Sequence, residues 1–136
     1  THIDHDPVVA GHDVRISSPD LLAAFSDGVV ATGVDVLDAG HVPYGPVLAA
    51  GRARDLPTAY VTASHLDREW NGIKFSDAAG RGYPEEANMA VEDLFHAREF
   101  AAGDGDRRAT GVIEAYRDGL LDRVDIDDVD VLMDCG

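Results

Sequence analysis

The sequence predicts an α/β domain of three layers, in which helices flank a mixed, mostly parallel sheet of about four strands. Three observations carry this prediction. Short β-rich runs alternate with amphipathic helical segments along the chain. A length of 136 residues suits one hydrophobic core. Hydrophobic residues make up 45% of the chain and charged residues 27%, which is a globular composition.

The first third of the chain predicts a strand, a helix and a second strand. The apolar run 7–13 (PVVAGHD) is typical of a buried strand. A helix is expected to begin at Ser18–Pro19, because Ser is a good N-cap and Pro suits the first helical position, and to end before Gly33. Residues 34–39 (VDVLDA) alternate as a strand does. The apolar face of the helix consists of Leu21, Leu22, Phe25, Val29 and Val30.

The rest of the chain continues the alternation. A short helix over 47–52 is followed by two β-rich strands, 58–62 (TAYVT) and 72–76 (GIKFS), with a polar loop between them. Apolar residues three and four apart predict an amphipathic helix over 84–98, and a similar pattern predicts a further helix over 110–123. The run 129–133 (VDVLM) predicts a last strand.

The charge of the chain is strongly negative. Twenty Asp and six Glu face ten Arg and one Lys, giving a net charge of −15, which argues against binding to nucleic acid or anionic membranes. An Asp-rich, Lys-poor composition is typical of halophilic proteins, and we expect the source to be a halophilic archaeon. The single Cys135 cannot form an internal disulfide, which favours a reducing cytoplasm.

The ends of the chain give a further expectation. No apolar run approaches the length of a membrane helix, and the first residues have neither the basic nor the apolar region of a secretory signal. The chain also starts without Met. We therefore expect an excerpt of a longer protein.

The densest group of reactive side chains follows the strand 58–62. Ser64, His65, Asn71 and Lys74 offer a hydroxyl, an imidazole, an amide and an ammonium close together in sequence. A polar turn with a surface histidine and no catalytic role explains these residues as well. A Ser-His-Asp hydrolase is disfavoured, because adjacent Ser64 and His65 project in different directions and no G-x-S-x-G motif occurs.

Residues 62–75 (TASHLDREWNGIKF) resemble the phosphoserine loop of the α-D-phosphohexomutase superfamily of phosphoglucomutases and phosphomannomutases, which usually has TASHNP followed by NG-x-K-F. Residues 11–18 (GHDVRISS) and 34–43 (VDVLDAGHVP) resemble two motifs of the superfamily's N-terminal domain I. The chain departs from these motifs at His12, at Leu66–Asp67 and by an insertion at Tyr44–Gly45.

The resemblance implies a domain division and a reaction. Residues 1–100 would be domain I without its extreme N-terminus, 101–127 a linker and helix, and 128–136 the truncated first strand of domain II. The reaction would interconvert hexose 1-phosphate and hexose 6-phosphate through a hexose 1,6-bisphosphate intermediate. The partners would be a phosphorylated hexose and the remaining domains of the same chain, without which this piece would be inactive.

The resemblance also assigns roles to single residues. Ser64 would be the phosphoserine, Lys74 the general acid and base, and His65 a phosphate-binding residue. Asn71 and Lys74 would also contact substrate or phosphate. Mg²⁺ would bind Ser64 through its phosphate oxygen, with carboxylates supplied by domain II.

Several alternatives remain open. One is a mutase-derived domain that binds sugar phosphates without turnover, and another is a flavodoxin-like receiver or nucleotide-binding domain with Asp13 or Asp38 at a strand end. Arg15 could stabilise the loop through Asp13, approach phosphate or form a plain surface ion pair.

The acidic segment near residue 105 is similar to a metal-binding loop, but we interpret it as a linker. Residues 104–107 (DGDR) lack the third Asp of the superfamily's metal loop and precede domain II, so we interpret them as linker. A calcium-binding EF-hand is excluded, because Arg108 and Ala115 stand where oxygen ligands are required.

Overall fold

A five-stranded sheet forms the centre of the molecule in the order β4-β3-β1-β2-β5. The computed structural model describes residues 7–124 and 129–134. In the middle of the sheet, β1 (Val8–His12) pairs in parallel with both β2 (Val36–His41) and β3 (Thr58–Val61). The edge strand β4 (Ile73–Ser76) runs antiparallel to β3. The predicted mixed, mostly parallel sheet is confirmed, with five strands in place of about four.

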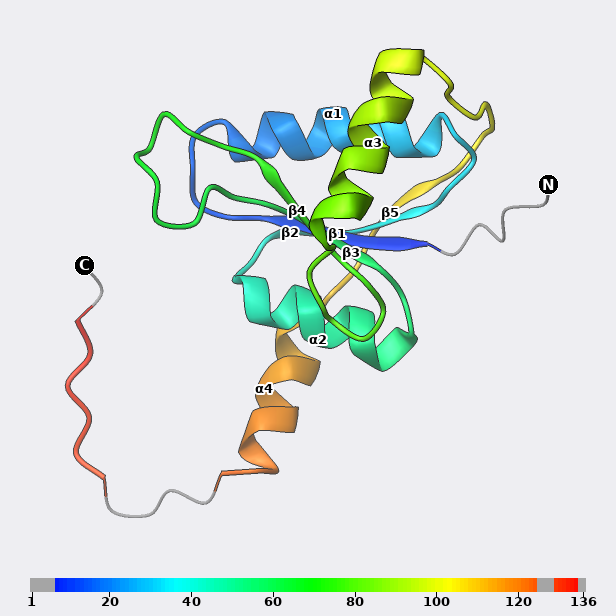
Figure 1. Ribbon diagram of the computed structural model, residues 1–136. Coiled ribbons are helices and arrows are strands. Elements are labelled where there is room, and N and C mark those ends of the chain that lie inside the picture. The colour runs from blue at the N-terminus through cyan, green and yellow to red at the C-terminus, as the bar shows by residue number, and fades with distance from the viewer. Residues whose placement is uncertain (1–6, 125–128, 135–136) are drawn as a thin grey trace.

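Two helices cover opposite faces of the sheet and form the outer layers (Figure 1). The helix α1 (Ser18–Val30) inserts Leu22 into a core cluster with Val8, Ala10 and Val36. On the other face, α2 (Tyr44–Arg54) inserts Val47 against Val9 and Tyr60. Alternate residues of β1 therefore enter different core layers, which is why its sequence is a continuous apolar run.

The helix α2 is longer than the predicted 47–52. It begins at Tyr44, so that Gly45 and Pro46 fall in its first turn. Pro is tolerated there because the backbone N–H groups of the first turn have no partner within the helix. The helix ends at Arg54, and Asp55 follows in the left-handed conformation with φ 56°.

The fifth strand, β5 (Arg107–Ala109), corrects the interpretation of residues 104–107 as a plain linker. It pairs in parallel with β2, and Arg107 forms an ion pair of 2.7 Å with Asp38. Just before the strand, the backbone N–H groups of Gly103 and Gly105 donate to carbonyls at the end of α1 over 2.8 Å. The sequence pattern does not reveal this strand, because it is three residues long and all of them are exposed.

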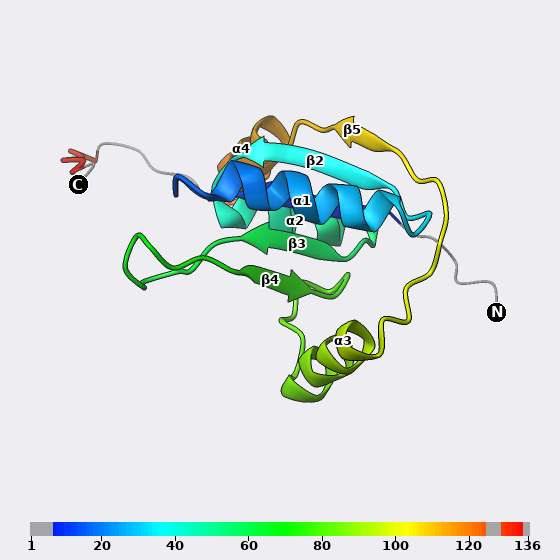
Figure 2. The ribbon, with the colours of Figure 1, turned by 90° about the horizontal axis from the view of Figure 1, so that it is seen from above.

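Two further helices match the predicted ones. The helix α3 (Glu85–Ala97) stands beyond the β4 edge of the sheet and has no buried residue, although its apolar spacing predicts a packed face (Figure 2). The helix α4 (Ile113–Leu121) packs under α2 (Figure 1). Among the described residues, no helix has the length and apolar character needed to cross a membrane.

The predicted strand over 129–133 is not a strand in this structure. Residues 129–134 form no regular element, and the side chains of Val131 and Leu132 are 77% and 99% exposed. A strand needs a neighbouring strand for its backbone hydrogen bonds, and no neighbour within the described residues pairs with this run.

Candidate functional site

A loop of residues 62–72, here called the Ser64 loop, joins β3 to β4 at the carboxyl end of the parallel strands. The segment after β1, which leads into α1, runs beside it (Figure 1). Carboxyl ends of parallel strands are where α/β sheets bind their ligands, because the following loops meet at that edge. The Ser64 loop therefore lies at the edge of the sheet where a ligand would bind, and its role as a site stays a prediction.

Ser64 is held in an unusual backbone conformation. Its φ is 54°, in the left-handed region that residues with a Cβ rarely adopt. The hydroxyl of Thr62 accepts a hydrogen bond of 3.0 Å from the Ser64 N–H, and the guanidinium of Arg15 donates one of 3.0 Å to the Ser64 carbonyl. The side chain is exposed, and within the described residues its hydroxyl has no hydrogen-bond partner. The oxygen is thus free to carry a substituent.

Asp13 anchors this arrangement from the end of β1. Its carboxylate accepts hydrogen bonds from the Ser18 hydroxyl over 2.6 Å, from the Thr62 hydroxyl over 2.7 Å and from Nε of Arg15 over 3.1 Å. Burial raises the pKa of Asp13, but the hydrogen bonds from Ser18, Thr62 and the Arg15 backbone and the positive charge of Arg15 outweigh burial, so the pKa lies below its ordinary value. Asp13 is therefore a stable carboxylate that links β1, α1 and the Ser64 loop.

The other predicted site residues lie at different places around this loop. His65 is exposed in the same turn as Ser64. The side-chain amide of Asn71 donates to the hydroxyls of Ser17 and Ser18 over 2.9 Å each, and its oxygen accepts from the N–H of Gly72. Asn71 thus ties the loop to the start of α1, and its predicted contact with phosphate stays a prediction.

Lys74 lies on β4 and is exposed. Its amine stands 5.8 Å from the centre of the Tyr44 ring, and its strand neighbour is Tyr60. Within the described residues, no hydrogen bond joins Lys74 to Ser64.

Tyr60, the strand neighbour of Lys74, has a raised pKa. Burial raises the pKa of Tyr60, as does the charge of Asp13, and the Tyr60 hydroxyl donates to the carbonyl of Val42 over 2.7 Å.

Sequence reasoning missed the anchoring residues Thr62, Ser17 and Ser18. All three have hydroxyl side chains at the end of a strand or the start of a helix, where such groups commonly bond to nearby backbone or carboxylate groups. That chemistry marks them as candidates, but their partners lie about fifty residues away in sequence. Only the sheet order brings them together.

The described residues do not form a complete metal site. In the ranges 7–124 and 129–134, no group of three or more His, Cys, Asp or Glu side chains converges. The carboxylate of Asp13, which anchors the loop from β1, is already occupied by its donors. A phosphate on Ser64 would offer Mg²⁺ one oxygen, and the remaining ligands would have to come from outside the described residues.

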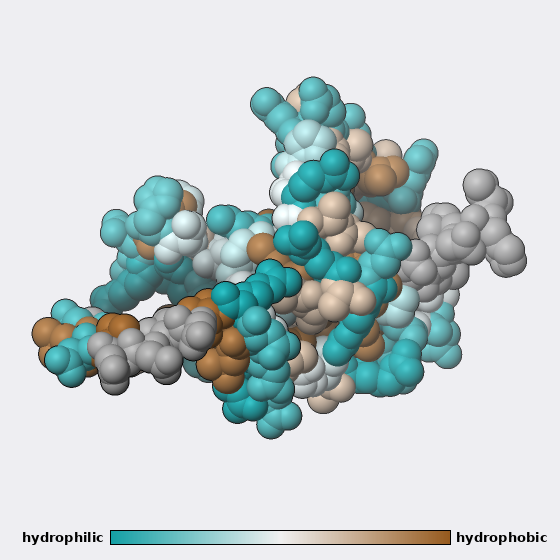
Figure 3. Space-filling model, turned by 90° about the horizontal axis from the view of Figure 1, so that it is seen from below, coloured by the Kyte–Doolittle hydropathy of each residue, from teal (hydrophilic) through white to brown (hydrophobic). Residues whose placement is uncertain are grey.

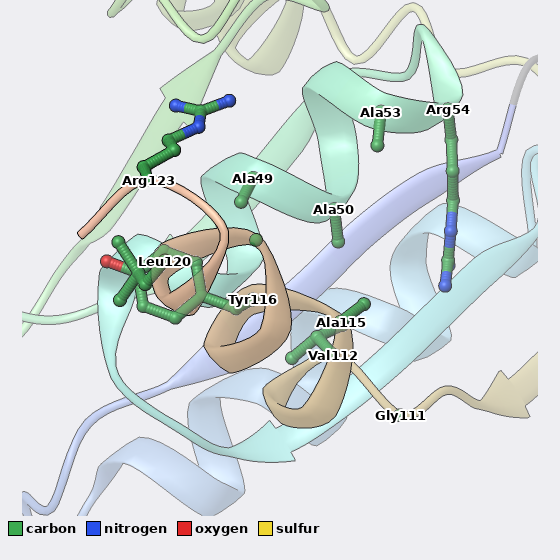
Figure 4. Close-up of a pocket in the computed structure, with 11 residues that line it drawn as sticks. Ala49, Ala50, Ala53, Arg54, Gly111, Val112, Ala115, Tyr116, Leu120 and Arg123 are labelled. Atoms are coloured by element: carbon green, nitrogen blue, oxygen red, sulfur yellow. The ribbon is translucent and has the colours of Figure 1, made fainter. Parts of the chain in front are cut away.

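A cavity of about 280 Å³ lies elsewhere, between α2 and α4 (Figure 4). Ala49, Ala53, Val112 and Tyr116 are among the residues that line it. Figure 3 shows the side of the molecule that carries α2 and α4, where hydrophobic residues surface among hydrophilic ones. The cavity shares no lining residue with the Ser64 loop, so it is separate from the candidate site.

The sequence of this chain matches a known protein family. A family described as phosphoglucomutase/phosphomannomutase, alpha/beta/alpha domain I, matches residues 2–102. The chain belongs to this family. The match covers the sheet up to β4, the Ser64 loop and α3, so the sequence resemblance in residues 62–75 extends to the whole domain.

Relatives and solved structures of the family are considerably longer than this chain. A phosphoglucomutase/phosphomannomutase of Thermococcus kodakarensis is 34% identical over 125 residues, which are 88% of this chain and 27% of that protein. A phosphoglucosamine mutase of Bordetella petrii is 42% identical over 90 residues, 65% of this chain and 20% of that protein. A crystal structure of a phosphoglucomutase/phosphomannomutase family protein from Burkholderia thailandensis superposes with a TM-score of 0.74 at 28% identity, covering 82% of this chain and 26% of that one.

Proposed function

We propose that this chain is the first domain of a phosphohexomutase that interconverts hexose 1-phosphate and hexose 6-phosphate through a phosphoserine at Ser64. One observation carries the proposal: in a chain of this family, the Ser64 hydroxyl is exposed and unpartnered within the described residues, while the backbone on both sides of it is hydrogen-bonded. A group that must give and take a phosphoryl group needs a free oxygen on a positioned backbone.

The proposed reaction consists of two phosphoryl transfers, each of which moves a different phosphoryl group. In the first transfer the bond between phosphorus and Oγ of Ser64 breaks, and a bond forms between phosphorus and a free hydroxyl oxygen of the hexose monophosphate. The proton of that hydroxyl passes to a base, a general acid delivers a proton to Oγ of Ser64, and Ser64 ends as a hydroxyl. The hexose 1,6-bisphosphate then turns around and returns its other phosphoryl group to Ser64, which restores the phosphoserine.

Lys74 would transfer the proton of the sugar hydroxyl, and His65 would bind the negatively charged phosphate. We propose Lys74 as the general acid and base, since an amine surrounded by phosphates can exchange a proton with a sugar hydroxyl. His65, exposed beside Ser64, would bind phosphate. When bound, Mg²⁺ would neutralise charge on the phosphoserine. The described residues do not by themselves form a complete magnesium site.

The substrate class and setting follow from the relatives and from composition. The relatives are called phosphoglucomutase/phosphomannomutase or phosphoglucosamine mutase, so we propose a phosphate of glucose, mannose or glucosamine as substrate. The chain matches about a quarter of the relatives' length, so the remaining domains would complete the site. The Asp-rich composition and single cysteine favour the cytoplasm of a halophile.

The test is the phosphate on Ser64 in an active protein that contains this chain. Intact-mass measurement should find one phosphate, and Ser64→Ala should remove both the phosphate and nearly all mutase activity. The control is Thr32→Ala, because Thr32 lies past the end of α1 and, among the described residues, its hydroxyl bonds only to the nearby carbonyl of Val29. An active enzyme with no phosphate on Ser64, or an active Ser64→Ala variant, would contradict the proposal.

A further inference from the structure

We infer that Arg15 is a positioning residue that holds the Ser64 loop through backbone carbonyls and makes no contact with phosphate. The inference rests on the proposed function of Ser64 and adds a residue to it. It decides between the roles that the sequence left open for Arg15: loop support, phosphate binding or a plain surface ion pair.

The contacts of the Arg15 side chain use its whole donor capacity. A guanidinium has five N–H groups in a fixed planar arrangement and no acceptor. The five acceptors are Oδ2 of Asp13 at 3.1 Å from Nε, the carbonyls of Asp67 and Trp70 at 2.7 and 3.0 Å from Nη1, and the carbonyls of Ser64 and Leu66 at 3.0 and 2.8 Å from Nη2. No N–H group is left to donate to a phosphate.

Burial supports the same role. The side chain of Arg15 is 11% exposed and that of its partner Asp13 is 19% exposed. In the other arginine ion pairs that the structure describes, the arginine is more exposed: 36% for Arg107 and 80% for Arg81. Arg15 is therefore enclosed by the loop that it binds, which a plain surface ion pair is not.

The planar arrangement of donors explains why this residue is an arginine. Four of the five acceptors are carbonyls of the loop between Ser64 and Trp70, and they converge on one guanidinium. A lysine carries the same charge but has only three donors on one atom, so it cannot serve five acceptors. Because the acceptors in the loop are all main-chain atoms, Arg15 holds the loop without occupying any side chain between Ser64 and Trp70.

The contact on Ser64 acts on its left-handed backbone. This conformation is unfavourable for a residue with a Cβ, so it persists only where neighbouring contacts enforce it. Arg15 binds the carbonyl of Ser64, and Thr62 binds its N–H. Loss of the Arg15 contacts should release this backbone while the sheet below stays intact.

Hydrogen exchange of this chain tests the inference directly. The amides of Ser64, Leu66 and Trp70 all make hydrogen bonds within the loop and report its order. We expect both Arg15→Lys and Arg15→Met to accelerate their exchange by about tenfold or more, with no change in β1 and β3. The matched control is Arg81→Lys, because Arg81 also binds a carboxylate through its guanidinium, in a different loop. The anisotropy of Trp70, the single tryptophan, is a second readout.

Three outcomes would overturn the inference. Wild-type protection in Arg15→Lys would mean that charge alone suffices. Wild-type protection in Arg15→Met would mean that Arg15 does not hold the loop. Equal loss of protection throughout the sheet would mean that Arg15 supports the whole fold.

Hydrogen exchange and kinetics together separate this inference from the proposed function. Exchange is measured on the unphosphorylated chain, so its result does not depend on whether Ser64 carries phosphate. Ser64→Ala should keep wild-type protection, because Arg15 binds the Ser64 carbonyl and not its side chain. In an active protein containing this chain, Arg15→Lys should lower kcat by about a hundredfold while KM changes little, since the substrate loses no direct contact.

Discussion

The chemistry proposed at single residues depends on which donors and acceptors are still free. Asn71 and Arg15 are polar residues at the site, but their donors are already used on neighbouring groups. Ser64, His65 and Lys74 remain exposed. The division is physical: groups that bond within the protein hold the loop, and exposed groups are available to the substrate.

Lys74 offers the sharpest test of the proton transfer. We expect Lys74→Arg to lower kcat by about a hundredfold, because a guanidinium keeps the charge but does not exchange its proton near neutral pH. Lys74→Met should be at least as slow, since it loses the charge as well. The measurement is kcat with glucose 1-phosphate and mannose 1-phosphate in an active protein containing this chain. Near-normal turnover by Lys74→Arg would leave Lys74 only a phosphate-binding role.

Asp13 gives a prediction about acid pH. Its pKa lies below the ordinary value, so the charged form stabilises the folded loop at every pH above about 4, where the unfolded carboxyl is also ionised. This stabilisation should be lost as the pH falls through the lowered pKa of the folded state. We expect the difference in unfolding free energy between wild type and Asp13→Asn to be constant from pH 7 to about 5 and to shrink below about 4. A difference that disappears already near neutral pH would contradict this.

Among the elements, β5 depends on close backbone contact. A Cβ on Gly103 would lie 2.5 Å from Cα of Gly33, and one on Gly105 would overlap the carbonyl of Val34. Small side chains are excluded here because backbone meets backbone, and neither partner can move aside cheaply. The glycines between the acidic residues of this segment therefore allow its backbone to pack against residues 32–34, which follow α1.

Gly103→Ala tests this packing. We expect it to lower the unfolding free energy by about 1 to 3 kcal/mol, because the added methyl group forces the segment away from the turn after α1. The matched control is Gly111→Ala in the same part of the chain, where an added Cβ meets nothing within 4 Å. That control should be neutral or stabilising by up to about 1 kcal/mol. Thermal or urea unfolding measures both, and equal effects would contradict the proposed contact.

The electrostatics of the whole molecule follow from its net charge of −15. Most of the ion pairs in the described residues join Arg to Asp, and many of their side chains are largely exposed, so each contributes little stability. Repulsion among the surplus carboxylates opposes the compact state and is screened by salt.

We therefore expect the Tm to rise from about 0.1 M to molar NaCl, as the screening length falls from about 10 to about 3 Å. Replacing three exposed acids together, Asp93→Asn, Glu99→Gln and Asp122→Asn, should raise the Tm at low salt and reduce its salt dependence. Differential scanning calorimetry of both proteins makes the comparison. A Tm that does not respond to salt would count against a halophilic origin.

Local patterns in the sequence determined most of the helices and strands and the position of the Ser64 loop. Apolar runs and breakers act over a few residues, so they predicted β1 to β4, α1, α3 and α4 close to their observed bounds. The N-cap predicted at Ser18 is wrong, because Ser18 is the first residue of α1 and its hydroxyl donates to Asp13. The motif in residues 62–75 marks Ser64 as the candidate phosphoserine in the same way, and this assignment stays a prediction. These signals depend on residues that are close in sequence, so they can be recognised without knowledge of the tertiary structure.

Tertiary structure alone decided the contacts that join distant segments. Arg15 meets carbonyls 49 to 55 residues away because β1 and β3 are neighbours in the sheet. The strand β5 exists because β2 offers it an edge, whereas the more apolar run 129–133 has no strand beside it within the described residues. A backbone hydrogen bond needs a partner in space, and a propensity along the chain cannot supply one.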